Sequence, residues 1–425
     1  MKSKISLFLA ILININIVIG GGFFLSTKVL SQKSGIFSAL AWLMVGIILL
    51  PLVLVLAKLS KAHPVSGGLY VYSHKALGPF WGFLSGWGYY VGTAAGNAVI
   101  LHAFRKLAEE MGLIQPILSL FKISGFGSDI FFIALFATLN LFNIELLGKI
   151  EVLFTILKTI PFALVIISSF FLFTTSNITP SHSFGISGML NSIPIVLFAY
   201  VGIEACCAIA HIIKDGKKNT SKAILIAMGI IVSLYTVIQF LIVGIHGPAI
   251  IDPFVGIIPK LTNNPILIKW GTHIVGIAIL SSFLGGFYSM FYTNNWNLFA
   301  MAEENKIPLS KQLLKLNTYK SPWLCIFAQA ILIIIFLMIT KNIENLMTMS
   351  DFGVVIAYLL STIAFIAMYK SKKSQLIVSG LSLLSCSYLL YACFNNLAKS
   401  GILFLLPYLG LLGIGLVGYK VKSRS

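Results

Sequence analysis

Long apolar segments separated by short polar connections run along the whole chain. A helix that crosses a bilayer needs about 20 predominantly apolar residues, and the pattern predicts about 12 such helices. Their expected ranges are Ile5–Thr27, Ile36–Ala57, Phe80–Phe104, Ile130–Leu147, Ile150–Phe173, Ile186–Ile212, Ala223–Ile245, Trp270–Ala300, Pro322–Thr340, Ser350–Tyr369, Gln375–Phe394 and Gly401–Tyr419. The pattern therefore predicts an all-α membrane protein.

The composition agrees with this prediction. Of the 425 residues, 58% are apolar and only 10% are charged, whereas a soluble protein of this length needs more charge to cover its surface. The formal net charge is +18, but the basic residues form short clusters between apolar runs, and Arg occurs only at Arg105 and Arg424. This distribution argues against nucleic-acid binding and favours the lipid bilayer as the partner.

The basic clusters also predict an orientation. Cytoplasmic loops of membrane proteins carry an excess of Lys and Arg. With twelve helices and both termini in the cytoplasm, the inner connections hold more than twice as many basic residues as the outer ones. Inner clusters include Lys2 with Lys4, Lys214 to Lys222, and Lys420 to Arg424. We therefore expect a multi-pass protein of the bacterial cell inner membrane with cytoplasmic termini.

Two of the predicted helices contain helix-breaking sequences at matching depth. Helix 1 carries Gly20, Gly21 and Gly22, and helix 6 carries Gly202 shortly before Glu204. Each glycine lowers helix stability by roughly 1 kcal/mol, and non-helical backbone inside a membrane persists only where it is buried in protein or lines a cavity. Both helices are expected to be broken. The alternative is that the glycines serve close helix packing.

The two interruptions lie five helices apart, so the two halves would insert in opposite senses. Paired interrupted helices in inverted repeats indicate the binding site of a secondary transporter. We expect a first inverted repeat in residues 1–175 (helices 1–5) and a second in residues 186–370 (helices 6–10). Residues 375–425 would form helices 11 and 12 and a cytoplasmic tail.

Three stretches of the sequence resemble a known family. The stretches Ile19–Phe23, Pro64–Phe80 and Phe198–Glu204 are similar to the amino acid–polyamine–organocation (APC) superfamily, and within it to the basic amino acid/polyamine antiporters of the arginine/agmatine type. The resemblance implies a 5+5 inverted repeat with broken helices 1 and 6, plus two peripheral helices. It also implies transport by alternating access.

The same resemblance implies roles for five residues. Asn97 and Ser350 match residues that contact the substrate in the antiporter branch. Tyr89 and Tyr358 match gating tyrosines there, and Glu204 matches an acid linked to gating and pH response.

Three positions depart from the antiporter pattern. Phe198 and Phe287 stand where that branch has tryptophans, and Gly21 replaces a serine that helps to bind the substrate carboxylate. These departures keep an aromatic box but weaken the assignment of arginine itself as the substrate. Aromatic faces attract cations, so the two phenylalanines would cover a substrate cation or close the pocket; the alternative is simple packing.

A broken helix also provides backbone groups for binding. Free N–H groups at the start of a half-helix bind anions without any side chain, so a substrate carboxylate is expected at Gly20–Gly22. Carbonyl groups of Phe198–Gly202 would accept hydrogen bonds from an α-ammonium group. Together the two breaks predict a site shaped for an amino acid.

Two charged residues lie inside predicted helices. A charge at mid-membrane is costly and marks a functional site, so Glu204 is expected to exchange a proton; a structural cap is the alternative. Lys158 lies where a proton-coupled branch of the superfamily has a lysine amine in place of sodium. It is either such a proton site or a lysine whose amine reaches the membrane interface.

Enzyme signatures are missing from the sequence. The five cysteines lie in apolar segments, the seven histidines lack metal-ligand spacing, and no phosphate-binding loop or nucleophile elbow occurs. We expect no enzyme activity, no cofactor and no metal.

The function expected is secondary transport of amino acids or their amine products, with amino acid/polyamine antiport of the arginine/agmatine or ornithine/putrescine type first. A proton-coupled amino acid symporter is the alternative, and a non-transporting membrane receptor is a distant one. The expected partners are a small-molecule substrate, protons in the symport alternative, and the bilayer; a homodimer is left open.

Overall fold

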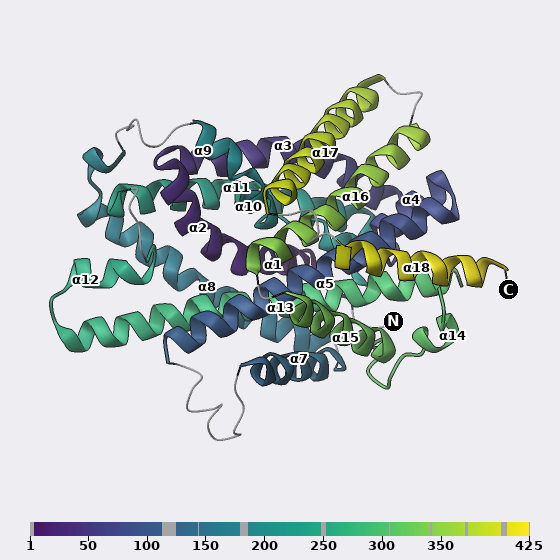
Figure 1. Ribbon diagram of the computed structural model, residues 1–425, viewed down its shortest axis with the longest axis horizontal. Coiled ribbons are helices and arrows are strands. Elements are labelled where there is room, and N and C mark those ends of the chain that lie inside the picture. Colours follow the sequence, from purple (N-terminus) through teal and green to yellow (C-terminus); the bar gives the residue numbers. More distant parts are fainter. Residues whose placement is uncertain are drawn as a thin grey trace.

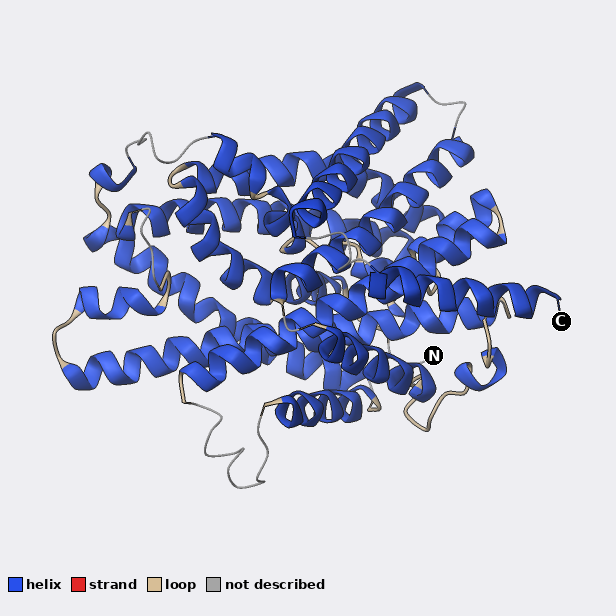
Figure 2. Ribbon diagram, in the orientation of Figure 1, coloured by secondary structure: helices blue, strands red, loops and turns tan. Residues whose placement is uncertain are grey.

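The structure, a computed structural model, describes residues 4–112, 125–142, 144–178, 186–247, 252–305, 307–340, 342–369, 373–400 and 406–424. Residues 401–405 of the predicted last helix and the basic residues Lys2, Lys306, Lys370 and Lys372 lie outside these ranges. Within the described ranges the regular structure is entirely helical (Figure 2).

The helices follow the order of the predicted segments. The part before residue 179 contains α1 (Leu7–Val18), α2 (Gly21–Ser34), α3 (Phe37–Ala62), α4 (Leu69–Leu77), α5 (Pro79–Glu110), α7 (Phe126–Asn140), α8 (Ile144–Leu172) and the 3₁₀ turn η1 (Thr175–Ile178). The next part contains α9 (Ile186–Asn191), α10 (Ile193–Phe198), η2 (Ala205–Cys207), η3 (Ala210–Ile212), α11 (Gly216–His246), η4 (Val255–Ile257), α12 (Ile258–Leu261), α13 (Pro265–Glu303), α14 (Ser310–Leu313), α15 (Trp323–Ile339) and α16 (Ile343–Tyr369). The last helices are α17 (Lys373–Ser400) and α18 (Leu406–Arg424).

Every predicted segment overlaps a helix of the structure. Among the described residues, six helices are long and apolar enough to cross a membrane, and a seventh span results if the bent pair of α1 and α2 is counted as one. The chain is therefore a multi-pass helical membrane protein. The count of twelve crossings and the inverted repeat stay predictions.

Two helices differ from the sequence-based ranges. The helix α4, between Gly68 and Gly78, was not predicted because its nine residues are too few and too polar for a span. The helix α16 begins at Ile343, about two turns before the predicted start at Ser350. The first turns of this helix contain the polar residues Asn345 and Thr348, which are buried inside the protein. The apolar pattern of the sequence therefore did not mark the start of the helix.

The helices α5 and α13 run side by side through the centre of the molecule (Figure 1). Around them, a buried polar cluster fixes α2, α3 and α11 to one another. The Gln239 amide accepts a hydrogen bond from Trp42 Nε1 at 3.0 Å and donates to the hydroxyls of Ser31 at 2.6 Å and Ser38 at 3.1 Å. Because these buried polar groups are paired, the end of α2 is held against α3 and α11.

The two ends of the molecule differ. The C-terminus, α4 and α14 lie toward the right of Figure 1, and α12 lies at the left. At the α14 end, backbone hydrogen bonds tie two other segments to the chain that follows the second break. They run from Ile5 N to Ile212 O at 3.0 Å and from Gly67 N, just before α4, to Ala208 O at 3.1 Å. These bonds close the α14 end around the start of α1.

Candidate substrate site at two broken helices

The first break lies between α1 and α2. The helix α1 ends at Val18, α2 begins at Gly21, and the two are bent by 43° relative to each other. The start of α2 has no side-chain cap, so its first N–H groups are available to a ligand. The predicted interruption of helix 1 is confirmed.

The glycines of this break also allow close packing. A Cβ atom added to Gly20 would lie 3.3 Å from the Cα of Gly286 on α13, and one added to Gly22 would lie 2.8 Å from the Cα of Ala199. The glycines therefore both interrupt the helix and allow close packing. This packing sets the distance between the two interrupted segments.

The second break follows α10. After Phe198 the chain forms turns, and Gly202 adopts φ of +103°, a conformation that favours glycine. Only the 3₁₀ turns η2 and η3 follow, so the predicted helix Ile186–Ile212 is α-helical in its first half alone. The interruption is confirmed: the α-helical conformation ends at Phe198, and only 3₁₀ turns follow up to Ile212.

One side chain contacts both breaks. The Tyr235 hydroxyl of α11 lies 2.7 Å from the carbonyl oxygen of Val18 and 3.2 Å from that of Ala199. These two carbonyls belong to the last residue of α1 and the first residue after α10. The two interrupted segments therefore meet at Tyr235.

Lys158 of α8 reaches the first break. Its side chain is 2% exposed, and its ammonium donates to the carbonyl oxygens of Ile19 at 2.7 Å and Asn16 at 3.3 Å. The Ser282 hydroxyl donates to the same Ile19 oxygen at 2.7 Å. The amine satisfies carbonyl groups that the end of α1 leaves free, and it does not extend to an interface.

Glu204 lies between two tyrosines. Its carboxylate is buried and accepts hydrogen bonds from Tyr89 of α5 at 2.6 Å and from Tyr358 of α16 at 2.5 Å. The structure thus brings together the three residues for which the family resemblance implies gating. A carboxylate that accepts two hydroxyl bonds connects α5, α16 and the second break.

Asn97 of α5 and Ser350 of α16 carry buried polar atoms without protein partners among the described residues. Both residues are buried, and among the described residues neither the Asn97 amide atoms nor the Ser350 hydroxyl has a hydrogen-bond partner. A Cβ atom on Gly96 would lie 2.8 Å from Ser350 Oγ, so α5 and α16 touch here. An unsatisfied buried polar group costs about 1–3 kcal/mol, which favours a bound ligand or water at these atoms.

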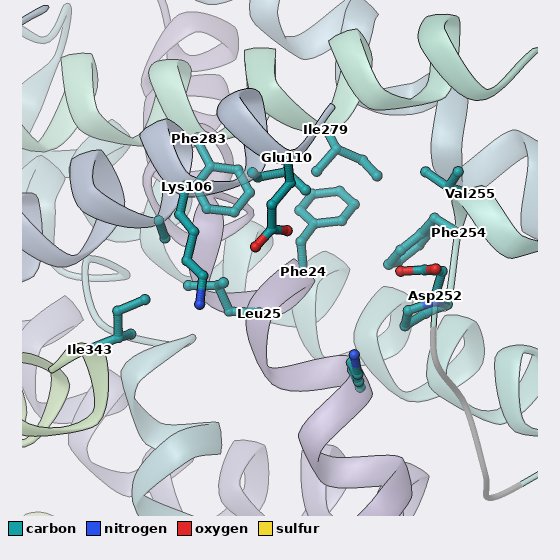
Figure 3. Close-up of a pocket in the computed structure, with 14 residues that line it drawn as sticks. Phe24, Leu25, Lys106, Glu110, Asp252, Phe254, Val255, Ile279, Phe283 and Ile343 are labelled. Atoms are coloured by element: carbon teal, nitrogen blue, oxygen red, sulfur yellow. The ribbon is translucent and has the colours of Figure 1, made fainter. Parts of the chain in front are cut away.

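A cavity of about 340 Å³ lies on the side of α12. Figure 3 shows Phe24 and Phe283 at its apolar side and Lys106, Glu110 and Asp252 around it. Phe283 also covers Gly21, because a Cβ atom on this glycine would lie 2.7 Å from its ring. The cavity therefore ends next to the first turn of α2.

The helix α5 orders these features along one axis. A helix rises about 1.5 Å per residue, so Ala103 at the cavity is about 20 Å from Tyr89 at the Glu204 cluster. Asn97 lies between them. The order along α5 is the cavity, then Asn97, then the hydrogen-bonded cluster of Glu204.

The two predicted aromatic residues have different places. Phe198 is the last residue of α10, directly before the break, and is 5% exposed. Phe287 instead packs on Phe136 of α7, with ring centroids 5.4 Å apart, and on Phe291. Phe283, one turn earlier on α13, takes the position against the first break. Sequence reasoning missed it because the rotation of α13 cannot be obtained from spacing alone.

Sequence reasoning also missed Glu151. This residue of α8 is fully buried, and its carboxylate accepts hydrogen bonds from Asn16 of α1 and Ser289 of α13. It lies one residue after the predicted start of helix 5 at Ile150, so the apolar pattern gave no sign that it is buried. The spacing of two helical turns between Glu151 and Lys158, which places both on one face, was the signal available.

Comparison with known proteins agrees with this arrangement. The family model described as amino acid permease matches residues 5–417. Over 389 residues the chain is 26% identical to the serine/threonine exchanger SteT of Bacillus subtilis (strain 168), covering 88% of this chain and 85% of that protein.

Two further relatives are similar over most of their length. The chain is 26% identical to the arginine/ornithine antiporter of Latilactobacillus sakei, over 90% of this chain and 84% of that protein. It is 23% identical to the branched-chain amino acid permease BcaP of Bacillus subtilis (strain 168), over 100% of this chain and 94% of that protein. The match to the family model covers nearly the whole sequence, and the chain belongs to the amino acid permease family of the APC superfamily.

Proposed function

We propose that this chain is an amino acid/polyamine antiporter of the arginine/agmatine or ornithine/putrescine type, working by alternating access. The meeting of the two interrupted segments at Tyr235 is the observation that carries the proposal. The unpartnered polar atoms of Asn97 on α5 and Ser350 on α16 supply further groups for a ligand. Names of relatives support exchange, since they include a serine/threonine exchanger and an arginine/ornithine antiporter.

The substrate occupies the space between the two breaks. Its carboxylate lies at the free N–H groups of Gly20–Gly22, which act as an anion site. Its ammonium group lies at the carbonyl side of Phe198–Gly202, and Asn97 and Ser350 complete the polar contacts. Phe198 and Phe283 cover the site, and a cationic side chain faces their rings.

Access alternates between the two ends of the molecule. In this conformation the cavity beside Phe283 is open, whereas the bonds of Ile5 with Ile212 and of Glu204 with its two tyrosines close the opposite end. With both termini on the cytoplasmic side of a bacterial inner membrane, the open cavity of this conformation faces outward. Rocking of the repeats 1–175 and 186–370, with residues 375–425 at the periphery, would open the other side.

A second candidate is proton-coupled amino acid uptake. The buried Lys158 amine on the carbonyls of Ile19 and Asn16 is the observation that favours it, because a cation at this place binds the break in one conformation and is released in the other. Loss of its proton would free the α1–α2 segment from α8.

Proteoliposomes containing the purified protein separate the two candidates. Labelled arginine and serine are supplied outside, with arginine, agmatine, ornithine, putrescine or no substrate inside, and with or without a pH gradient. The antiporter requires internal substrate at every gradient. Uptake that ignores internal substrate and follows the gradient identifies the symporter, and binding without uptake under all conditions would refute both.

A further inference from the structure

Glu151 is a buried acid that substrate binding does not use. It lies on α8, two turns before Lys158 on the same face, which corresponds to about 10 Å along the helix. Its carboxylate accepts hydrogen bonds from the Asn16 side-chain amide and the Ser289 hydroxyl. Three helices therefore meet at this one carboxylate: α8, α1 and α13.

Asn16 connects Glu151 with Lys158. Its side-chain amide donates to the Glu151 carboxylate, and its backbone carbonyl accepts from the Lys158 ammonium at 3.3 Å. Helical side chains point toward the N-terminus of their helix, so the ammonium reaches back toward the acid. Asn16 thus bridges the acid and the amine across the last turn of α1.

Other ionisable groups near Glu151 are few. Tyr288 of α13 faces it, while α1 contributes the neutral Asn16. The elements α11 and η4 also pack against α8, and in the described ranges neither places a hydrogen-bonding or ionic partner on Glu151. Lys158 is therefore the basic group that Asn16 links to Glu151.

We propose that Glu151 is the counter-charge of Lys158, and that its ionised carboxylate holds α1 and α13 against α8 in this conformation. Glu151 is a positioning residue, since it acts through Lys158 and Asn16. A carboxylate accepts both hydrogen bonds and carries the charge opposite to the Lys158 ammonium, whereas a protonated carboxyl group becomes a donor on one oxygen and no longer supplies this counter-charge. Protonation of Glu151 thus loosens the end of α1.

This inference rests on the proposed transport cycle in one respect, the effect on the pH profile. The variants are Glu151→Gln, Lys158→Met, the double variant, and Glu145→Gln as the matched control. Glu145 is an exposed acid on the same helix, so the same substitution there leaves the pair intact.

The pH dependence of uptake is the first measurement. Without its counter-charge the Lys158 ammonium gives up its proton more readily, so Glu151→Gln shifts the profile toward acidic pH, while Glu145→Gln keeps that of the wild type. A serine or arginine uptake profile of Glu151→Gln that coincides with the wild type overturns the proposal.

The melting temperature in detergent is the second measurement and needs no transport. Removal of one member of a buried pair leaves an uncompensated charge, so each single variant melts several degrees lower. The double variant removes both charges and recovers most of the loss, which is the non-additivity of a coupled pair. If the losses in melting temperature of the two single variants simply add in the double variant, the pairing is overturned, whether or not an amino acid is transported. If the double variant recovers its melting temperature but shows no uptake, the pairing is supported and only the transport proposal is contradicted.

Discussion

The hydroxyl group of Tyr358 donates a hydrogen bond to Glu204, a residue 154 positions earlier in the chain. With the bond from Tyr89, this contact joins α5, α16 and the second break around one buried carboxylate. We propose that this acid controls a gate through its protonation, because the ionised form accepts from both tyrosines whereas the protonated form carries a donor on one oxygen.

We predict that Glu204→Gln removes the part of the pH dependence of uptake that this carboxylate contributes, leaving the part contributed by Lys158, while the protein stays folded. The glutamine amide retains one acceptor and similar volume but does not titrate. Uptake in proteoliposomes across a pH series, together with the melting temperature, checks this.

Tyr358→Phe is the companion variant. It keeps the carboxylate but removes one hydrogen bond that favours the ionised form, so the pH profile persists and shifts toward higher pH. A Glu204→Gln protein that transports with an unchanged pH profile would remove Glu204 from the gate.

Asn97→Ala is expected to weaken substrate binding without lowering stability. The amide atoms of Asn97 have no partner among the described residues, so the substitution breaks no hydrogen bond of the protein. A lost hydrogen bond to a charged substrate group costs about 1.5–3 kcal/mol, which raises KM about 10- to 100-fold.

The matched control for this variant is Gln329→Ala on α15. Gln329 is also a buried amide without a partner in the described part of the chain, but it lies on a helix outside the breaks. The KM of the Gln329→Ala protein should equal that of the wild type. Equal effects of the two substitutions on KM would show that Asn97 has no special role in binding.

Close approach of the two interrupted segments should depend on Gly22. An alanine there places its Cβ 2.8 Å from the Cα of Ala199, so backbone must move, at a cost of about 1–3 kcal/mol. We predict that Gly22→Ala abolishes uptake.

Gly229→Ala on α11 serves as the control, because a Cβ atom there meets no atom within 4 Å and alanine favours helix. It should transport normally and melt slightly higher. Normal uptake by Gly22→Ala would mean that the distance between the segments is not critical.

The cavity beside Phe283 is expected to open to the outside of the cell. Leu107→Cys, in the lining of the cavity, should react with a membrane-impermeant thiol reagent in intact cells, and substrate should slow the reaction. The native cysteines are buried. Leu316→Cys, which is exposed between α14 and α15, should react only in broken cells; the reverse pattern would invert the proposed orientation.

Sequence patterns predicted the interruptions because glycines destabilise a helix wherever it lies. The break between α1 and α2 lies at Ile19 and Gly20, within about one residue of the position that Gly20–Gly22 predicted. The cluster of Tyr89, Glu204 and Tyr358 could be predicted only through family resemblance, since no spacing connects three residues so far apart.

Other features depend on tertiary structure alone. Phe283 rather than Phe287 faces the first break because packing on Phe136 sets the rotation of α13. Glu151 acquires its importance from Asn16, which lies 135 residues away in the sequence. Neither contact leaves a periodic signal in the chain.

A structure with a transported amino acid bound tests the central claim most directly. We predict the ligand carboxylate within hydrogen-bonding distance of the backbone N–H groups of Gly21 and Gly22, and its ammonium group at the carbonyls of Phe198–Gly202. A ligand bound elsewhere, with residues 7–34 and 186–212 forming two uninterrupted helices, would contradict it.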